Sequence, residues 1–271
     1  MNPNWLFIPT LLLATVVFII GIYFGEYQLH HPKNVFNFLV LIVVSIIIAI
    51  PGILFTVYYL HFFDNASWFY QFRSLPWTEL SASGLGLLGG VLYKLARHHH
   101  LVSRTFMPVI LVMLLMWLMI PYVKPLFYSV DFKHFEDRWF QGICLQTTPS
   151  SCGPASAATL LRAVGYLVSE RQLAQECFTS IGGTENWYIA RALKRRGLEV
   201  KYLITTAQPS QLYYPAIAGV RLNNGVGHFV TILGETESSY LIGDPLVGKR
   251  LLNKNHFNNY YYFTGFFMLV K

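Results

Sequence analysis

The chain has 271 residues, of which 54% are hydrophobic and only 12% are charged. Soluble domains carry roughly 25% charged residues, so this composition indicates lipid contact and argues against a wholly soluble protein. The net charge of +7 is not gathered into a basic block. Its densest cluster, Lys194 to Arg196, lies on a predicted amphipathic helix and is interpreted as a solvated helix face. We therefore expect no nucleic-acid partner.

The uneven spread of charge predicts two domains. Residues 1–123 contain five Lys or Arg and three Asp or Glu, whereas residues 124–271 contain fifteen and ten. The first part has the composition of a membrane anchor, and roughly 150 residues suffice for one soluble core. We predict a transmembrane anchor at 1–123, a connector at 124–139 and a folded domain at 140–271.

Apolar stretches in the first part predict a bundle of about four transmembrane helices. They cover about residues 5–24, 35–61, 75–93 and 106–123. A helix needs about 20 apolar residues to cross a bilayer core. The third stretch is the weakest, because it contains Glu79 and several glycines. Its Gly86 and Gly90 are spaced so that a neighbouring helix can approach closely.

The positive charges of the first part predict how the anchor is oriented. No Lys or Arg precedes Lys33, so the first stretch is a retained anchor rather than a cleaved signal peptide. Basic loops at 26–34 and 94–104 lie on one side of a four-helix anchor, and the positive-inside rule places that side in the cytoplasm. We predict an integral membrane protein whose C-terminal domain faces the periplasm or the cell exterior.

Three consecutive histidines, His98 to His100, fall in the second basic loop. No Cys or carboxylate accompanies them locally, and a closed metal site needs further ligands of defined geometry. They are interpreted as a basic cytoplasmic turn. We predict neither a metal nor another cofactor.

The second part is predicted to be an α+β domain, because its helical patterns precede its strand patterns. Helices are predicted at 152–164, 169–177 and 184–196. Strands are predicted at 198–204, 214–222, 228–233, 240–242 and 260–270. Ser169 and Gln172 suit a capping box at the second helix. Turns between the strands favour an antiparallel sheet.

Cys152 is the candidate nucleophile. It is followed by Gly153 and Pro154 and then by a helical pattern, and proline is well tolerated in the first turn of a helix. The thiol is therefore predicted at a helix N-terminus, where free backbone N–H groups and the helix dipole favour a thiolate.

Three further residues complete a catalytic constellation. His228 opens an apolar strand and is the candidate base. Asp244 ends the next strand, sixteen residues later, where a hairpin returns it to the imidazole. Gln146 lies six residues before Cys152, close enough to donate a hydrogen bond to an oxyanion.

This ordered set resembles the bacteriocin-processing cysteine peptidases of the C39 family over about residues 140–271. The matching residues are Gln146-x5-Cys152-Gly153, His228-Phe229-Val230 and Asp244-Pro245. The resemblance implies a papain-like fold and cleavage of a peptide or protein substrate, often with a double-glycine leader, at a bacterial cytoplasmic membrane. It also implies that Gln146 holds the oxyanion, Cys152 attacks, His228 acts as base and Asp244 orients it.

Two features depart from the family pattern. The family commonly has Asp before the nucleophile, and this chain has Ser151, which changes the surroundings of the triad rather than the triad. The family often occurs inside ABC exporters, but no Gly-x4-Gly-Lys-Ser/Thr phosphate loop occurs in these 271 residues, so we expect no ATP. The peptidase of those exporters is cytoplasmic, whereas the basic loops here place the domain outside.

Two other functions fit the same residues. A degenerate peptidase domain would bind a peptide without cutting it, although such a module has no need of a thiolate. An acyl transferase would use the same acyl-enzyme and release it to an amine instead of water. The remaining cysteines, Cys144 and Cys177, are slightly favoured to form a disulfide in an oxidising compartment.

Overall fold

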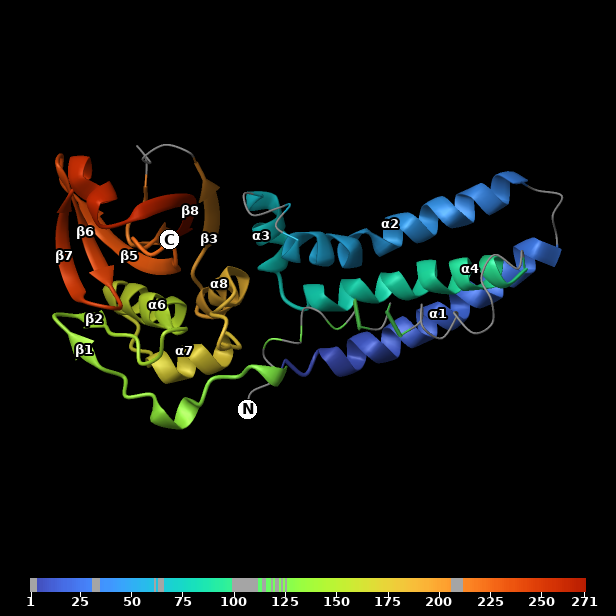
Figure 1. Cartoon of the computed structure of the whole chain (residues 1–271), viewed down its shortest axis with the longest axis horizontal. Coiled ribbons are helices and arrows are strands. Elements are labelled where there is room, and N and C mark those ends of the chain that lie inside the picture. The colour runs from blue at the N-terminus through green and yellow to red at the C-terminus, as the bar shows by residue number, and fades with distance from the viewer. Residues whose placement is uncertain are drawn as a thin grey trace. The chain divides into compact units, whose positions relative to one another are not determined.

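The structure of the chain is a computed structural model that describes residues 4–30, 35–60, 62, 66–98, 126–205 and 212–271, and single positions between 112 and 124. It divides into two compact units. A helical unit contains Asn4–Asp64 and Trp77–Val123, and a C-terminal unit contains Met1–Pro3, Asn65–Pro76 and Lys124–Lys271. Figure 1 shows the elements of both units.

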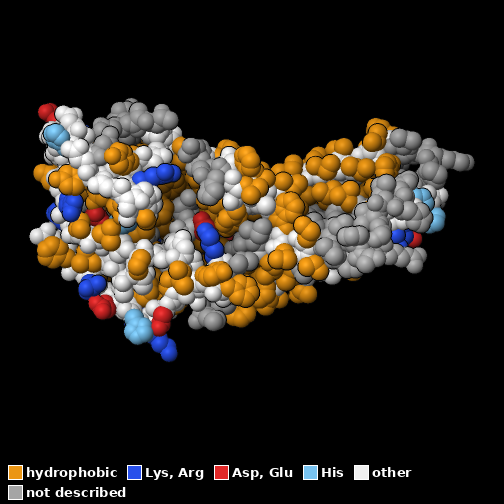
Figure 2. All heavy atoms as spheres, in the orientation of Figure 1, with side chains coloured by type: hydrophobic (Ala, Val, Ile, Leu, Met, Phe, Trp, Pro, Cys, Tyr) orange, Lys and Arg blue, Asp and Glu red, His pale blue; other side chains and the backbone are white. Residues whose placement is uncertain are grey.

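Two described helices of the helical unit are long and apolar enough to cross a membrane. They are α1 (Phe7–His30) and α2 (Val35–Tyr59), with mean hydropathies of 2.4 and 3.1. A short 3-10 helix, η1 (Thr78–Ser83), then leads into α4 (Gly84–His98). Among the described residues on the visible face of this unit, apolar side chains predominate, as Figure 2 shows.

The side chains on the two faces of α1 differ in size as they do in membrane helices. Its exposed side includes large apolar residues at helical spacing, namely Leu12, Val16, Ile19 and Tyr23. Its buried positions are small, namely Thr10, Ala14, Gly21 and Gly25. A helix of a soluble protein buries its large apolar residues, whereas small residues let membrane helices pack backbone to backbone.

Helices α1 and α4 make this close contact through the predicted glycines. A Cβ atom at Gly86 would collide with the carbonyl oxygen of Ala14, and one at Gly90 with that of Phe18. The prediction that these glycines admit a neighbouring helix is therefore confirmed. Lys94 and Glu26 form an ion pair of 2.6 Å near the C-terminal ends of the two helices.

Of the four stretches predicted to span the membrane, only the first two coincide with described helices that are long and apolar enough to do so. The third is divided between η1 and α4, and α4 has 15 residues, fewer than a span of about 20 requires. The helix also continues to His98, so the predicted loop at 94–104 begins later than expected. Most of the fourth stretch, at 106–123, lies outside the described residues.

The C-terminal unit is built on an antiparallel sheet of six strands in the order β3-β8-β4-β5-β6-β7. Its strands are β3 (Val200–Ile204), β4 (Ala216–Arg221), β5 (Gly227–Glu235), β6 (Ser239–Asp244), β7 (Gly248–Asn253) and β8 (Tyr262–Val270). A separate small hairpin joins β1 (Trp139–Phe140) to β2 (Ile143–Cys144). The predicted antiparallel sheet is confirmed.

Strand β7 was not predicted, since the region after Asp244 reads as a turn. Chain reversal occupies residues 245–247, and β7 then pairs with β6 along the edge of the sheet. Its sequence, Gly-Lys-Arg-Leu-Leu-Asn, has little apolar alternation. An edge strand has a neighbour on one side only, so it needs fewer buried side chains to form.

All three predicted helices are present, as α6 (Cys152–Ala163), α7 (Glu170–Glu176) and α8 (Asn186–Lys194). Ser169 caps α7, because its side chain accepts a hydrogen bond from the Gln172 N–H at 3.0 Å. Thr184 does not begin α8 as predicted. Its hydroxyl instead pairs with that of Thr179, at 2.8 Å.

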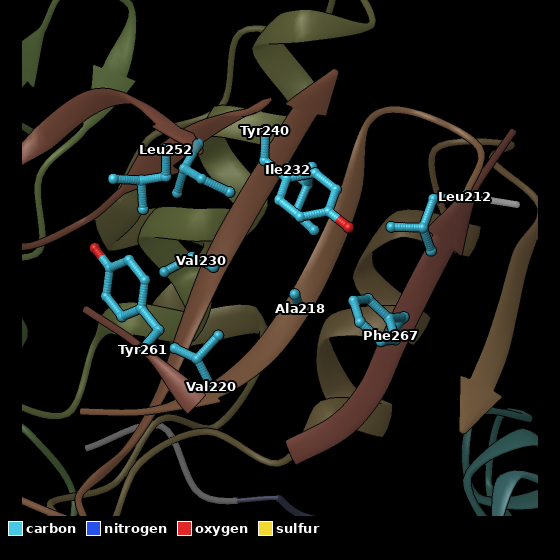
Figure 3. Close-up of a cluster of buried hydrophobic side chains, with 10 residues drawn as sticks. Leu212, Ala218, Val220, Val230, Ile232, Tyr240, Leu252, Tyr261 and Phe267 are labelled. Carbon is cyan, nitrogen blue, oxygen red and sulfur yellow. The ribbon is translucent and has the colours of Figure 1, made fainter. Parts of the chain in front are cut away.

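A cluster of buried side chains from the sheet itself supplies much of the core of this unit (Figure 3). Its members are Leu212, Ala218, Val220, Val230, Ile232, Tyr240, Ile242, Leu252, Tyr261 and Phe267. They come from strands β4 to β8 and from the residues just before β4 and β8. Burial of this apolar area, at about 25 cal/mol per Å², stabilises the central strands.

A segment from the first part of the chain also belongs to the C-terminal unit. Helix α3 (Ser67–Arg73) packs against α8, where Arg191 donates two hydrogen bonds to the Arg73 carbonyl oxygen, at 3.0 and 2.7 Å. Phe69 and Trp187 make an edge-to-face ring contact at 6.4 Å. The predicted anchor at 1–123 is thus interrupted by residues that fold with the other unit.

Candidate active site

Cys152 is the first residue of α6 and is partly exposed. Two hydrogen bonds fix this helix to β5: the Ser156 hydroxyl donates to the Phe229 carbonyl at 2.9 Å, and the Thr231 hydroxyl donates to the Ser156 carbonyl at 2.8 Å. Because β5 also bears His228, these bonds fix the thiol relative to the candidate base. The thiol lies at a helix N-terminus, as predicted.

His228 and Asp244 form a buried pair. The Nε2 atom of His228 lies 3.0 Å from Oδ1 of Asp244, and their side chains are only 4% and 3% exposed. His228 stands near the start of β5 and Asp244 at the end of β6, two antiparallel neighbours. By strand alternation, His228 shares a face with Val230 of the buried cluster.

The imidazole of His228 also interacts with the thiol of Cys152. Burial lowers the pKa of His228, but hydrogen bonds to Asp244 and Cys152 and their negative charges outweigh it and raise the pKa to about 9. Since Nε2 is engaged by Asp244, Nδ1 is the nitrogen that remains for the thiol. His228 therefore contacts the carboxylate of Asp244 directly and lies close enough to the thiol of Cys152 for the thiol to affect its pKa.

Asp244 has two further partners. Its Oδ1 accepts a hydrogen bond from the Leu246 N–H at 2.8 Å, and its Oδ2 accepts one from the Tyr261 hydroxyl. Burial raises the pKa of Asp244, but the bonds to His228, Tyr261 and Leu246 outweigh this and lower it below its usual value. Tyr261 was not predicted, because nothing in the sequence distinguishes it from neighbouring tyrosines.

Gln146 forms hydrogen bonds through both its backbone and its side chain. Its backbone N–H donates to the Pro245 carbonyl at 2.9 Å, next to Asp244. Its side-chain Nε2 donates to the Thr148 carbonyl at 2.8 Å. A primary amide has two N–H donors, so this bond orients the amide and leaves a second donor for a ligand.

Ser151, which stands where the resemblance expects Asp, is fully buried. Its hydroxyl accepts a hydrogen bond from the Thr148 N–H at 2.9 Å. Glu170, on α7, is also fully buried and hydrogen-bonds to the same loop. Burial raises the pKa of Glu170 more than its hydrogen bonds lower it. Sequence reasoning missed Glu170 because an acid in the first turn of a helix is common.

The expected disulfide between Cys144 and Cys177 is wrong, because both are buried free thiols. Each is fixed in a different part of the core: the Cys144 N–H bonds to the Thr159 hydroxyl, and Cys177 ends α7. Burial raises the pKa of Cys177 to about 12 and also raises that of Cys144. Of the three cysteines, Cys152 alone has an exposed surface.

Among the residues that the structure describes, there is no cluster of three His, Cys, Asp or Glu side chains that would hold a metal ion. His98 ends α4, while His99 and His100 lie outside the described residues.

Residues 141–271 match the model of the Peptidase C39 family. The matched region contains all four predicted site residues. We call this region the C39 domain, after the family model that it matches. The match agrees with the resemblance found in the sequence.

Two relatives from Methanothermobacter each match about half of the chain. An uncharacterized protein of Methanothermobacter marburgensis is 29% identical over 140 residues, which are 51% of this chain and 95% of the relative. One of Methanothermobacter thermautotrophicus is 27% identical over 129 residues, 48% of this chain and 87% of the relative.

Two solved structures resemble the C39 domain. One is the peptidase domain of Streptococcus ComA, a bi-functional ABC transporter, with 25% identity, a TM-score of 0.42 and coverage of 47% of this chain and 96% of that chain. The other is a double glycine motif protease from an AMS/PCAT transporter in complex with its leader peptide, with 25% identity, a TM-score of 0.42 and coverage of 48% and 89%.

Proposed function

We propose that the protein is a membrane-anchored cysteine peptidase that cleaves a peptide through an acyl-enzyme on Cys152. The observation that carries this proposal is the buried His228–Asp244 pair, which adjoins a partly exposed thiol at the N-terminus of α6. A thiol needs a base, the base needs a fixed orientation, and these contacts meet both needs.

In the proposed reaction, Nδ1 of His228 takes the proton of the Cys152 thiol, and the sulfur attacks the peptide carbonyl carbon. The second N–H of the Gln146 amide and the Cys152 backbone N–H stabilise the oxyanion. The C–N bond then breaks, and His228 passes its proton to the leaving amine. Water attacks the thioester, gives a proton to His228 and releases the acid, and the proton returns to the sulfur. Asp244 holds the imidazole and balances its charge.

The helical unit serves as the anchor in this proposal. Its support is the hydropathy of α1 and α2 and the apolar, outward-facing stripe of α1. If the third and fourth apolar stretches also span the membrane, the positive-inside rule places the peptidase domain on the outer side. Following the family resemblance, the first substrates to test are peptides with a double-glycine leader.

The experiment is the rate of Cys152 alkylation by iodoacetamide as a function of pH, in the full-length protein and in His228→Ala. A free thiol titrates near a pKa of about 8.5, while a histidine-paired one titrates several units lower. We expect rapid labelling at acidic pH that is lost in His228→Ala. Cys152→Ala should remain folded and unlabelled, because Cys144 and Cys177 are buried.

Slow labelling in both proteins, rising only at alkaline pH, would instead favour a peptide-binding module without catalysis. Where a cleaved peptide is found, its product mass with and without an added amine separates hydrolysis from acyl transfer.

A further inference from the structure

Glu170 contacts the loop between Gln146 and Cys152 at both of its ends. At one end, its Oε1 accepts the Thr147 N–H at 2.9 Å and its Oε2 accepts the Thr147 hydroxyl at 2.6 Å. At the other end, its carboxyl group lies near the side chain of Ser151, whose hydroxyl donates to the Thr148 carbonyl oxygen at 3.0 Å. One carboxylate thus binds the residue that follows Gln146 and lies beside the residue that precedes Cys152.

The same loop is closed internally by Thr148. Its backbone N–H donates to the Ser151 hydroxyl at 2.9 Å, and its carbonyl oxygen accepts the Gln146 amide at 2.8 Å. The Gln146 amide therefore takes its direction from Thr148, whose position depends on Thr147 and Ser151. Any displacement of these two residues is transmitted to the amide.

Glu170 is suited to hold this loop because it is fixed itself. It is the first residue of α7, its exposed fraction is 0%, and the Ser169 cap fixes the start of the helix. Loss of these hydrogen bonds would leave a buried carboxyl group unsatisfied and lower the stability of the fold, so the bonds are maintained. The contact is a buried polar network rather than a surface ion pair.

We propose that Glu170 is a positioning residue for catalysis, which holds the Gln146–Cys152 loop so that the thiol and the oxyanion-binding amide face the same carbonyl carbon. Glu170 does not touch the substrate. This inference rests on the proposed function, since it assigns the residue that aligns two groups of the proposed mechanism.

The test compares two reactions of Cys152 in the full-length protein. Iodoacetamide requires a thiolate but creates no oxyanion, whereas acylation by p-nitrophenyl acetate passes through a tetrahedral oxyanion. In Glu170→Gln, we expect acylation to fall about tenfold to a hundredfold while alkylation stays within about threefold, because misplacement of a donor affects only the former. Rates are expressed per folded molecule, and Cys152→Ala supplies the background.

Two further variants separate positioning from folding. Glu176 lies on the same helix, but its carboxylate pairs with Arg196 at 2.8 Å and does not contact the loop. Glu176→Gln should therefore leave the ratio of the acylation rate to the alkylation rate unchanged. Thr147→Val keeps the backbone N–H but removes the hydroxyl, and it should lower the ratio in the same direction. In the double variant with Glu170→Gln, the ratio should fall by less than the two separate effects combined. The reason is that both changes alter the same contact, between the Thr147 hydroxyl and the Glu170 carboxylate.

An unchanged ratio in both Glu170→Gln and Thr147→Val would overturn the inference. The proposed function would survive that result if His228→Ala still abolished labelling at acidic pH. If labelling of the original protein did not depend on His228, the proposed function and this inference would fail together.

Discussion

At the scale of single residues, His228, Asp244 and Gln146 of the candidate site are each held by hydrogen bonds to neighbouring groups. The Leu246 N–H shares Oδ1 of Asp244 with His228, Tyr261 donates to Oδ2, and Thr148 orients Gln146. Such a network fixes the imidazole before a substrate arrives, which lowers the cost of reaching the transition state. The partners of Asp244 are therefore expected to affect both stability and rate.

Tyr261→Phe should lower the free energy of unfolding by about 1–3 kcal/mol, because Oδ2 of Asp244 stays buried without its donor. The alkylation rate of Cys152 at acidic pH should fall less than in Asp244→Asn. Urea unfolding and the labelling rate check both effects. Tyr260→Phe is the matched control, since Tyr260 is half exposed, and this change should alter neither measurement.

The raised pKa of His228, about 9, predicts how stability depends on pH. The folded state favours the charged imidazole, so this contribution is complete below the unfolded pKa of about 6.5 and is lost as the pH rises through the folded pKa. Between pH 6.5 and 9.5, the unfolding free energy of the original protein should fall more steeply than that of His228→Gln. The control is His256→Gln, which removes an exposed histidine and should keep the pH dependence of the original protein. If His228→Gln also kept that pH dependence, the raised pKa of His228 would be contradicted.

At the scale of elements, the site depends on how α6, β5 and β6 are joined. The β5–β6 hairpin brings His228 and Asp244 to neighbouring strand ends, and the Ser156 and Thr231 hydrogen bonds attach α6 to β5. The hairpin was predictable because its alternation and its turn are local in sequence. The contacts of α6 with β5 join residues more than 70 positions apart, which no local pattern specifies.

In the helical unit, the contact of α1 with α4 is sensitive to side-chain volume. Gly90→Ala should destabilise it by about 1–3 kcal/mol, because the added methyl group meets the backbone of Phe18 and the helices must move apart. Thermal unfolding in detergent measures this loss. Leu92→Ala, on the exposed side of α4, should have a smaller effect, and equal losses would contradict close backbone packing at Gly90.

At the scale of the whole molecule, composition divides the chain more simply than the structure does. The low charge of residues 1–123 indicates an anchor, yet α3 within that stretch folds with the C-terminal unit. Helix α3 carries Trp68 and Phe69 beside Arg73, so its composition does not distinguish it from a membrane interface. Its contacts with Arg191 and Trp187 determine where it belongs.

The predicted orientation can be tested with reporters fused after Lys271. If the C39 domain faces outward, alkaline phosphatase at this position should be active and a cytoplasmic fluorescent reporter should not be. The opposite pattern would place the domain in the cytoplasm, through either an odd number of spans or the reverse orientation of the anchor. Fusions after Tyr59, at the end of α2, provide the internal reference.

The sequence by itself determined the apolar helices, the α+β order and the candidate residues, because hydrophobic periodicity, turn chemistry and motif spacing are local properties. It also indicated the family, since the ordered spacing of Gln146, Cys152, His228 and Asp244 is specific. Only the tertiary structure decided that Cys144 and Cys177 are buried apart, that Tyr261 bonds to Asp244 and that Glu170 holds the nucleophile loop. These contacts join elements distant in the chain, and their partners are ordinary residues until folding buries them together.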